Sequence, residues 1–452
     1  MFVQSISAFL NSNAGILTFV GLLGAFIMFL RKYAENRKSK RIRRFEKICS
    51  TLRKKEKTLS YENMMNKWYK KEYKENFEGN YLLYKKALCK NNKWFHQREM
   101  KLIKLKSIKI RYFGIFHGSN VNAIGDEPND PIVAEKYYQQ MKNIFPEPKK
   151  SFVFNAIEYL KKKYWSDTTF ALKDFSMDYK TEKVVLDVYV GKYFSALNTC
   201  MPFQYETAYE DIFKNLKEPS RKSLRRKFPL LKTDNRFVKI GVSILTIIRN
   251  IESENNGTRQ NIFLLHRRSG PVAAQEDQIH VVPSGEFQPV EIDFSLSREI
   301  IENTLNNSEN LMTTVEREFA EEILGKPEVI KLGNCGVLRK YFPKNDLDNT
   351  YLLGAGFYPL DTHFDIFGIT VIDACSHILG YSLGELKHSL YELNQKHKGE
   401  ESFSEGKIEW YPFDEVELRN FLNNQDATLS LKSLFELILD DFEYISEQLN
   451  LH

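Results

Sequence analysis

The stretch Arg317-Glu318-Phe319-Ala320-Glu321-Glu322 decides the fold of this chain. On an α-helix, Glu318, Glu321 and Glu322 stand at positions i, i+3 and i+4, so their carboxylates share one face. Like charges this close repel one another, and a helix gains from them only when a cation lies between them. Oxygen ligands suit a hard ion such as Mg²⁺ or Mn²⁺ better than zinc. The pattern predicts a divalent-metal site on one helical turn, with a solvated acidic helix face as the alternative.

The segments around this stretch have the pattern of a sheet with flanking helices. Residues 242–248 and 262–268, which precede it, are strand-like segments. Residues 280–287 are His-Val-Val-Pro-Ser-Gly-Glu-Phe. Residues 408–412, Ile-Glu-Trp-Tyr-Pro, are followed by Asp414-Glu415. Glu309 lies eight residues before Arg317, a spacing that suits a buried brace.

This set of segments resembles the Nudix box and the domain that carries it, over roughly residues 238–450. The resemblance implies an α/β/α sandwich with a mixed sheet. In it, residues 242–248 and 262–268 are the two opening strands, and residues 280–287 are the strand and turn that enter the box. Residues 408–412 are the last strand, and Asp414-Glu415 begin the final helix. It also implies a hydrolase that cleaves a nucleoside diphosphate linked to another group. In that reading Glu318, Glu321 and Glu322 bind Mg²⁺ or Mn²⁺, which polarises a pyrophosphate and activates water. Arg317 would hold the glutamates by charge-assisted hydrogen bonds, and Glu309 would orient it.

Two arginines complete the implied site. Arg267 and Arg268 end the second strand, where they would bind a substrate phosphate, although an exposed strand end explains them equally well. The sequence departs from the Nudix pattern at Ser284, which stands where the first of two glycines is usual. It departs again in the insertion of residues 286–308 between Gly285 and Glu309. The insertion puts substrate access and turnover in doubt and leaves the glutamates intact.

The N-terminus predicts a membrane anchor. Residues 1–30 carry no charged side chain, and the run from Ala14 to Leu30 has only Thr18 as a polar residue. Such a helix is roughly 25 Å long at 1.5 Å per residue, close to a bilayer core of about 30 Å. The positive charges follow the apolar run, the reverse of a secretory signal. We therefore expect a single-pass inner-membrane protein whose C-terminal domains are cytoplasmic; a buried helix or a cleaved leader is the alternative.

The basic charge of the chain is local. Residues 31–60 contain 13 Lys or Arg against three Glu, a net charge of +10, whereas the whole chain carries +6. Next to a membrane helix, this stretch most simply meets anionic head groups, so a lipid bilayer is an expected partner of residues 1–30 and of the basic segment. Binding of nucleic acid is the alternative explanation of the basic segment, but nothing in the pattern requires it. Five cysteines without a Cys-x-x-Cys pair exclude the usual zinc spacings and favour a reducing compartment.

The sequence predicts an α+β protein in four parts. These are a transmembrane anchor (1–30), a basic and mainly helical juxtamembrane stalk (31–110), an α+β accessory module (111–236) and a Nudix-like domain (237–452). Within the accessory module, residues 183–194 alternate β-branched and aromatic side chains and predict a strand.

Two functions remain open. In the first, the chain is a membrane-anchored Nudix-type hydrolase of a nucleotide. In the second, its architecture resembles that of the membrane–Nudix effectors of bacterial anti-phage systems, in which the Nudix fold senses a cyclic nucleotide and triggers membrane disruption. Both readings make a nucleotide the ligand, and both allow a homo-oligomer.

Overall fold

The computed structural model describes the placement of most of the chain. Glu309 lies outside the described residues. The described residues are 13–72, 82–83, 102–116, 141–142, 144–145, 168–178, 183–230, 232–252, 259–268, 278–289, 295–307, 311–323, 346–373 and 406–451.

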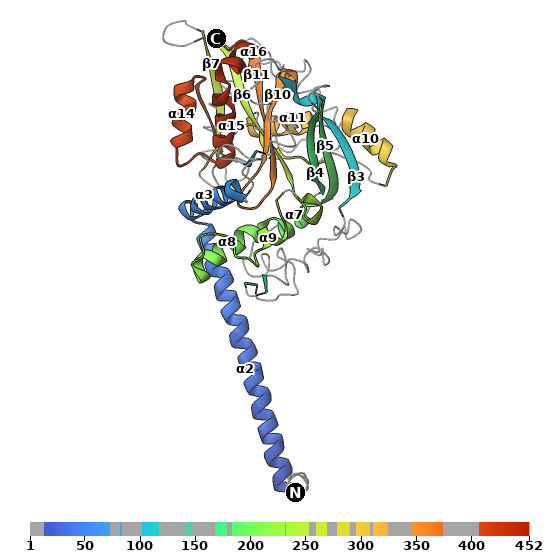
Figure 1. Cartoon of the computed structure of the whole chain (residues 1–452), viewed down its shortest axis with the longest axis vertical. Helices are drawn as coiled ribbons and strands as arrows, with labels where there is room; N and C mark the ends of the chain where they lie inside the picture. Colours follow the sequence, from blue (N-terminus) through green and yellow to red (C-terminus); the bar gives the residue numbers. More distant parts are fainter. Residues whose placement is uncertain are drawn as a thin grey trace.

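A long helix, α2 (Asn13–Leu52), extends away from the rest of the molecule (Figure 1). Its C-terminal end packs on α8 (Met201–Lys214), where the ring of Phe45 stacks on Tyr205 at 5.6 Å. The next helix, α3 (Lys55–Glu72), also lies against α8. The predicted helical stalk is therefore helical from residue 31 to Glu72, with a break at residues 53–54.

The prediction of a single-pass inner-membrane protein is wrong. In the part of the chain that the structure describes, no helix is long and apolar enough to cross a membrane. Of the predicted anchor, residues 1–12 and the side chains of residues 13–24 lie outside the described part. The apolar side chains from Ala25 to Leu30 are exposed, and Arg31 and Lys32 follow on the same helix.

The body is built on a large mixed sheet. Its main strand order is β1-β10-β11-β6-β7-β12; β2 pairs with β10, β8 with β7, and β9 with β6. β11 and β6 are parallel, whereas β7 is antiparallel to β6, β8 and β12. The strands predicted at 242–248, 262–268, 280–287 and 408–412 all lie in this sheet. The bounds are β1 Leu82–Leu83, β2 Ile103–Lys104, β6 Ile240–Glu252, β7 Arg259–Arg268, β8 Ile279–Val281, β9 Ser284–Glu286, β10 Thr350–Phe357, β11 Phe364–Asp373 and β12 Gly406–Pro412.

The alternation of β7 shows that helices cover both faces of this sheet. Phe263 meets Phe421 of α14 (Glu415–Asn423) and Phe435 of α15 (Leu429–Asp440). His266 is three residues further along an unbroken register, so it points to the opposite face. There it meets Glu322, which follows helix α11 (Leu311–Glu318). The sheet is therefore a middle layer. The last helix, α16 (Phe442–Leu449), follows α15.

The accessory module contains a second sheet of three strands. Its order is β3-β5-β4, with β3 parallel and β4 antiparallel to β5, which is the strand predicted at 183–194. Backbone hydrogen bonds from Phe170 to Phe287 and from Leu172 to Val238 join β4 to the large sheet. One continuous core runs from Phe45 to Leu451, and the predicted domain boundaries stay predictions. The bounds are β3 Lys109–Ile115, β4 Thr168–Asp178, β5 Lys183–Lys192, α7 Tyr193–Thr199 and α9 Leu224–Lys227; short 3₁₀ turns lie at η2 Leu105–Ser107, η3 Thr233–Asn235 and η6 Asp346–Asn349.

The predicted insertion contributes a helix, α10 (Arg298–Asn307), that docks on the accessory sheet. Asn306 accepts a hydrogen bond from the backbone N–H of Ile110 at 2.9 Å and donates one to its carbonyl at 2.8 Å. Glu302 accepts from the backbone N–H of Tyr112 at 3.0 Å. These bonds satisfy backbone groups of β3, so this part of the insertion lies against β3.

Candidate functional site

The acidic stretch forms two different kinds of helix. α11 (Leu311–Glu318) is an ordinary α-helix that buries Leu311, Met312 and Val315. The next five residues, Phe319–Ile323 (η4), form a π-helical turn with Phe319, Ala320 and Ile323 buried. Because the i→i+5 bonding of a π turn takes in one more residue than an α turn, the expected α-helical face is not kept. The prediction that one α-helical face carries all three glutamates is therefore wrong in its geometry.

Arg317 braces the first glutamate. Its side chain donates to Glu318 Oε1 from Nη2 at 2.6 Å and from Nε at 3.1 Å, and to the carbonyl oxygen of Glu286 at 2.9 Å. Burial lowers the pKa of Arg317, but Glu318, Glu321 and Glu286 outweigh burial and raise the pKa above its ordinary value. The predicted charge-assisted bond from Arg317 is confirmed for Glu318. Glu309, its predicted orienting partner, lies outside the described residues.

Glu318 also lies tightly against the turn that enters β9. A Cβ atom built on Gly285 would stand 2.1 Å from both Cδ and Oε1 of Glu318. No side chain fits there while Glu318 keeps its place. Gly285 is therefore required by close approach, which agrees with the role expected of a glycine before the acidic helix.

Glu322 reaches the same turn from the π-helical segment. Its Oε2 accepts a hydrogen bond from the backbone N–H of Ser284 at 2.8 Å. Its Oε1 is buried, has no hydrogen-bond partner within the described chain, and lies 3.6 Å from Nδ1 of His266. Both side chains are only 2% exposed. Glu318 and Glu322 thus converge on the dipeptide Ser284-Gly285 from two turns of one helical segment.

The carboxylates of this site suit a divalent ion that needs only one or two protein ligands. Among the residues that the structure describes, no group of three or more His, Cys, Asp or Glu could hold a metal, so the predicted three-carboxylate cluster is not assembled. The negative charge of Glu321 helps to raise the pKa of Arg317. However, Mg²⁺ is commonly held by one or two carboxylates together with water and substrate phosphates. Glu318 and Glu322 supply two carboxylates, and the buried Oε1 of Glu322 is an oxygen that a cation would satisfy.

The two arginines predicted to bind substrate lie on different faces of β7. Arg267 points to the face of Phe263, away from Glu322. It donates to Glu409 at 3.2 Å and lies 3.6 Å from Asp426. Its position argues against the predicted phosphate contact. Arg268 shares the face of His266, and its Nε is buried without a hydrogen-bond partner in the described structure. Arg268 remains the candidate for an anionic ligand.

The two histidines of this region have different surroundings. The sequence favours a satisfied structural role for both, and His280 has one: Nδ1 lies 3.2 Å from the carbonyl of Val281 and Nε2 lies 3.2 Å from Oγ of Ser430. Burial lowers the pKa of His280 to about 3, so the ring stays neutral. His266 lies directly opposite His280 on β7. Its Nδ1 faces Glu322 and has no hydrogen-bond partner in the described structure. The two histidines differ in their tertiary neighbours, Ser430 for His280 and Glu322 for His266. The sequence contained no signal for this difference.

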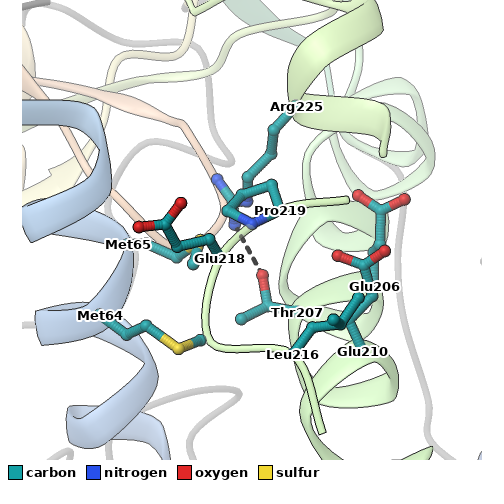
Figure 2. Close-up of a pocket in the computed structure, with 9 residues that line it drawn as sticks. All are labelled: Met64, Met65, Glu206, Thr207, Glu210, Leu216, Glu218, Pro219 and Arg225. Atoms are coloured by element: carbon teal, nitrogen blue, oxygen red, sulfur yellow. Dashed lines mark hydrogen bonds between the residues drawn. The ribbon is translucent and has the colours of Figure 1, made fainter. Parts of the chain in front are cut away.

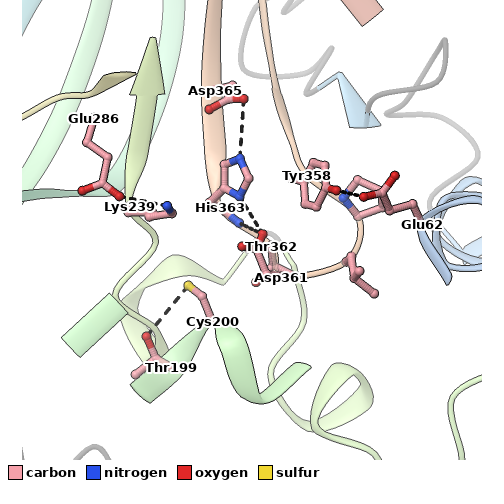
Figure 3. Close-up of polar contacts among 12 residues, drawn as sticks. Glu62, Thr199, Cys200, Lys239, Glu286, Tyr358, Asp361, Thr362, His363 and Asp365 are labelled. Atoms are coloured by element: carbon pink, nitrogen blue, oxygen red, sulfur yellow. Dashed lines mark hydrogen bonds and ion pairs between the residues drawn. The ribbon is translucent and has the colours of Figure 1, made fainter. Parts of the chain in front are cut away.

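A second polar cluster, which the sequence did not indicate, lies where β10 turns into β11 (Figure 3). The ring of His363 lies between Asp361, 2.6 Å from Nδ1, and Asp365, 3.5 Å from Nε2. Burial lowers the pKa of His363, but the two aspartates outweigh burial and raise it to about 10. Burial raises the pKa of Asp361, but His363 and Lys239 outweigh burial and lower it to about 2. We call Asp361, His363 and Asp365 the clamp, because the ring of His363 joins two aspartates of this turn.

Neighbouring groups tie this clamp to the helices and to the candidate site. Tyr358 donates a hydrogen bond to Glu62 of α3, and burial raises the pKa of Glu62 to about 8. Lys239 donates to Glu286 Oε1 at 2.8 Å, and Glu286 also accepts from Arg317 through its carbonyl. Burial raises the pKa of the Cys200 thiol to about 11, so at neutral pH the protonated thiol is favoured over the nucleophilic thiolate.

A small cavity between α3, α8 and α9 is too small for a ligand (Figure 2). Its volume is about 10 Å³, which holds at most one water. Met64, Glu206 and Arg225 are among its lining residues. It lies in the helical part of the molecule, and we assign no function to it.

Comparisons with known proteins give one structural likeness. No family model matches the chain, and no curated protein matches it. Among solved structures, part of the chain is similar to a MutT/Nudix family protein from Listeria innocua, with 15% sequence identity and a TM-score of 0.24. The similarity covers 47% of this chain and 98% of that chain. A likeness at this level assigns no activity.

Proposed function

We propose that this chain is a Nudix-type hydrolase that cleaves a phosphoanhydride in a nucleoside-diphosphate-linked or related nucleotide. The observation that carries the proposal is the convergence of Glu318 and Glu322 on the Ser284-Gly285 turn. A helical pair of carboxylates held against a backbone turn is an arrangement that binds a divalent ion and a phosphate together. The Nudix-like sequence pattern of residues 238–450 supports the same class.

In this proposal each residue has a distinct task. Glu318 and Glu322 hold Mg²⁺ or Mn²⁺. Arg317 fixes the Glu318 carboxylate through the bonds at 2.6 and 3.1 Å, and the N–H of Ser284 fixes that of Glu322. Arg268 offers its guanidinium to an anionic substrate group. When bound, the ion supplies Lewis-acid polarisation of the phosphate.

The test is a product screen with the full chain. Nucleoside-diphosphate-linked compounds are incubated with Mg²⁺ or Mn²⁺, and products are separated by chromatography. We expect a nucleotide product whose formation falls roughly 100-fold in Glu318→Gln and in Glu322→Gln, since each removes a charged ligand. Glu415→Gln is the matched control, because Glu415 lies on α14 with its side chain 45% exposed and pairs with Arg419 on the same helix. Equal rates in all three variants would overturn the proposed site.

A second candidate is a nucleotide-binding module without turnover. The engagement of Glu318 by Arg317, together with the absence of a three-carboxylate group in the described part of the chain, favours it. It predicts that a nucleotide raises the melting temperature of the full chain by mass action and that no product forms. Product formation that depends on Glu322 would exclude this candidate.

A further inference from the structure

Two buried polar atoms face each other beside the candidate site. Glu322 Oε1 and His266 Nδ1 are 3.6 Å apart, and neither has a hydrogen-bond partner among the residues described. Both side chains are 2% exposed. Buried polar atoms are nearly always bonded, so a facing pair without bonds is unusual and points to a missing third participant.

The separation of the two atoms indicates what kind of participant fits. At 3.6 Å they are too far apart for a hydrogen bond. Two ligand atoms each about 2.1 Å from one metal ion stand about 3.4 Å apart at the tetrahedral angle. The observed spacing is therefore close to that of two ligands of one cation.

Both side chains are held in this orientation by the fold. The other carboxylate oxygen of Glu322 is fixed by the N–H of Ser284 at 2.8 Å. His266 lies in β7, between β12 on one side and β8 on the other. Its Nε2 is so close to Gly406 that a Cβ there would stand 2.7 Å away. The oxygen and the nitrogen are thus positioned before any ion arrives.

We propose that Glu322 and His266 together chelate a divalent cation, and that the imidazole nitrogen makes the site prefer a transition-metal ion such as Mn²⁺ or Co²⁺ over Mg²⁺. Imidazole binds Co²⁺ well and Mn²⁺ more weakly, but it binds both better than Mg²⁺, which takes oxygen ligands almost alone. The inference rests on the proposed function because it uses the same glutamate, but it concerns metal binding and needs no substrate.

The experiment measures metal binding to the full chain in the absence of nucleotide. Co²⁺ is titrated by its visible absorption, and Mg²⁺ affinity is obtained from calorimetry. The variants are His266→Gln, Glu322→Gln and, as matched control, His280→Gln, which changes the buried histidine opposite His266 in the register. Far-ultraviolet circular dichroism checks that each variant is folded.

We expect the wild type to bind Co²⁺ more tightly than Mg²⁺. His266→Gln should weaken Co²⁺ binding roughly tenfold or more and Mg²⁺ binding about twofold or less, because only the nitrogen ligand is lost. Glu322→Gln should weaken both, and His280→Gln neither. Equal Co²⁺ affinity in wild type and His266→Gln, or Mg²⁺ bound as tightly as Co²⁺ by the wild type, would overturn the proposal.

A measurement on the unaltered chain covers the case in which His266→Gln does not fold. Pulsed electron paramagnetic resonance of bound Mn²⁺ detects coupling to a directly bound nitrogen. Coupling is the expected result, and its absence overturns the proposal. Because no substrate is used, a failed hydrolysis screen leaves this outcome unaffected, and the reverse also holds.

Discussion

Replacing Gly285 by alanine tests the closest contact of the candidate site. The added Cβ would lie 2.1 Å from Cδ and Oε1 of Glu318, whereas an ordinary contact begins at 3.4 Å. The carboxylate must therefore retreat by about 1.3 Å, the difference between these distances, and leave its bonds to Arg317 at 2.6 and 3.1 Å. Charge-assisted bonds contribute about 1.5–3 kcal/mol, so we expect the free energy of unfolding to fall by about 1–3 kcal/mol.

The sign of the effect should reverse once Glu318 is removed. In a Glu318→Ala background the contact is gone, and the backbone of Gly285 is not in the left-handed region. There Gly285→Ala restricts the unfolded chain and should raise the free energy of unfolding by about 0.4–1 kcal/mol. Urea unfolding of the wild type, both single variants and the double variant gives the coupling energy. Additive effects, with no change of sign, would refute the close approach of Glu318 to Gly285.

Two further perturbations test the clamp and the helical part. Because the pKa of His363 is raised, its pairing with Asp361 contributes fully to the free energy of unfolding below the unfolded pKa of 6.5 and is lost as pH rises through about 10. The difference in unfolding free energy between wild type and His363→Gln should therefore shrink over that pH range. A difference that stays constant would contradict the pairing. Arg225 is 2% exposed and donates to Tyr69 at 2.8 Å, the carbonyl of Pro359 at 2.9 Å and Thr207 at 3.2 Å. Arg225→Met should lower the free energy of unfolding by about 3 kcal/mol because these acceptors lose their donor. Arg225→Lys should restore only part of this loss, since one ammonium cannot span the same acceptors; full restoration by lysine, measured by urea unfolding, would contradict the network.

Some strands of the large sheet could be predicted because their patterns are local. Residues 242–248 are rich in β-branched side chains and residues 262–265 are all apolar, and these segments lie within β6 and β7. The predicted membrane anchor is wrong, because no helix in the described part of the chain is long and apolar enough to cross a membrane. The described apolar residues before Arg31 belong to the same helix, α2, as the basic residues after it.

The contacts of the candidate site could likewise be predicted only in part. The contact of Arg317 with Glu318 was expected from the resemblance to the Nudix box, since neighbours i and i+1 on a helix do not by themselves face each other. The separation of Arg267 from Arg268 follows from strand alternation, but which face of β7 meets the acidic helix depends on packing. His266 has no partner close in sequence; its neighbour Glu322 is brought to it by the sheet and by α11.

By itself, the sequence determined the segments that form β5, β6, β7 and β12, and that a glutamate-rich helical segment follows a glycine turn, because these properties depend on side-chain periodicity and on neighbours within a few positions. It did not predict β11, which lies beside β6 in the large sheet, or β10, which pairs with β11. Only the tertiary structure decided that the helix changes to a π turn at Phe319, that Glu322 points to His266, and that α10 docks on the accessory sheet. Each of these depends on the burial of groups far apart in the chain, whose energies a local pattern does not contain.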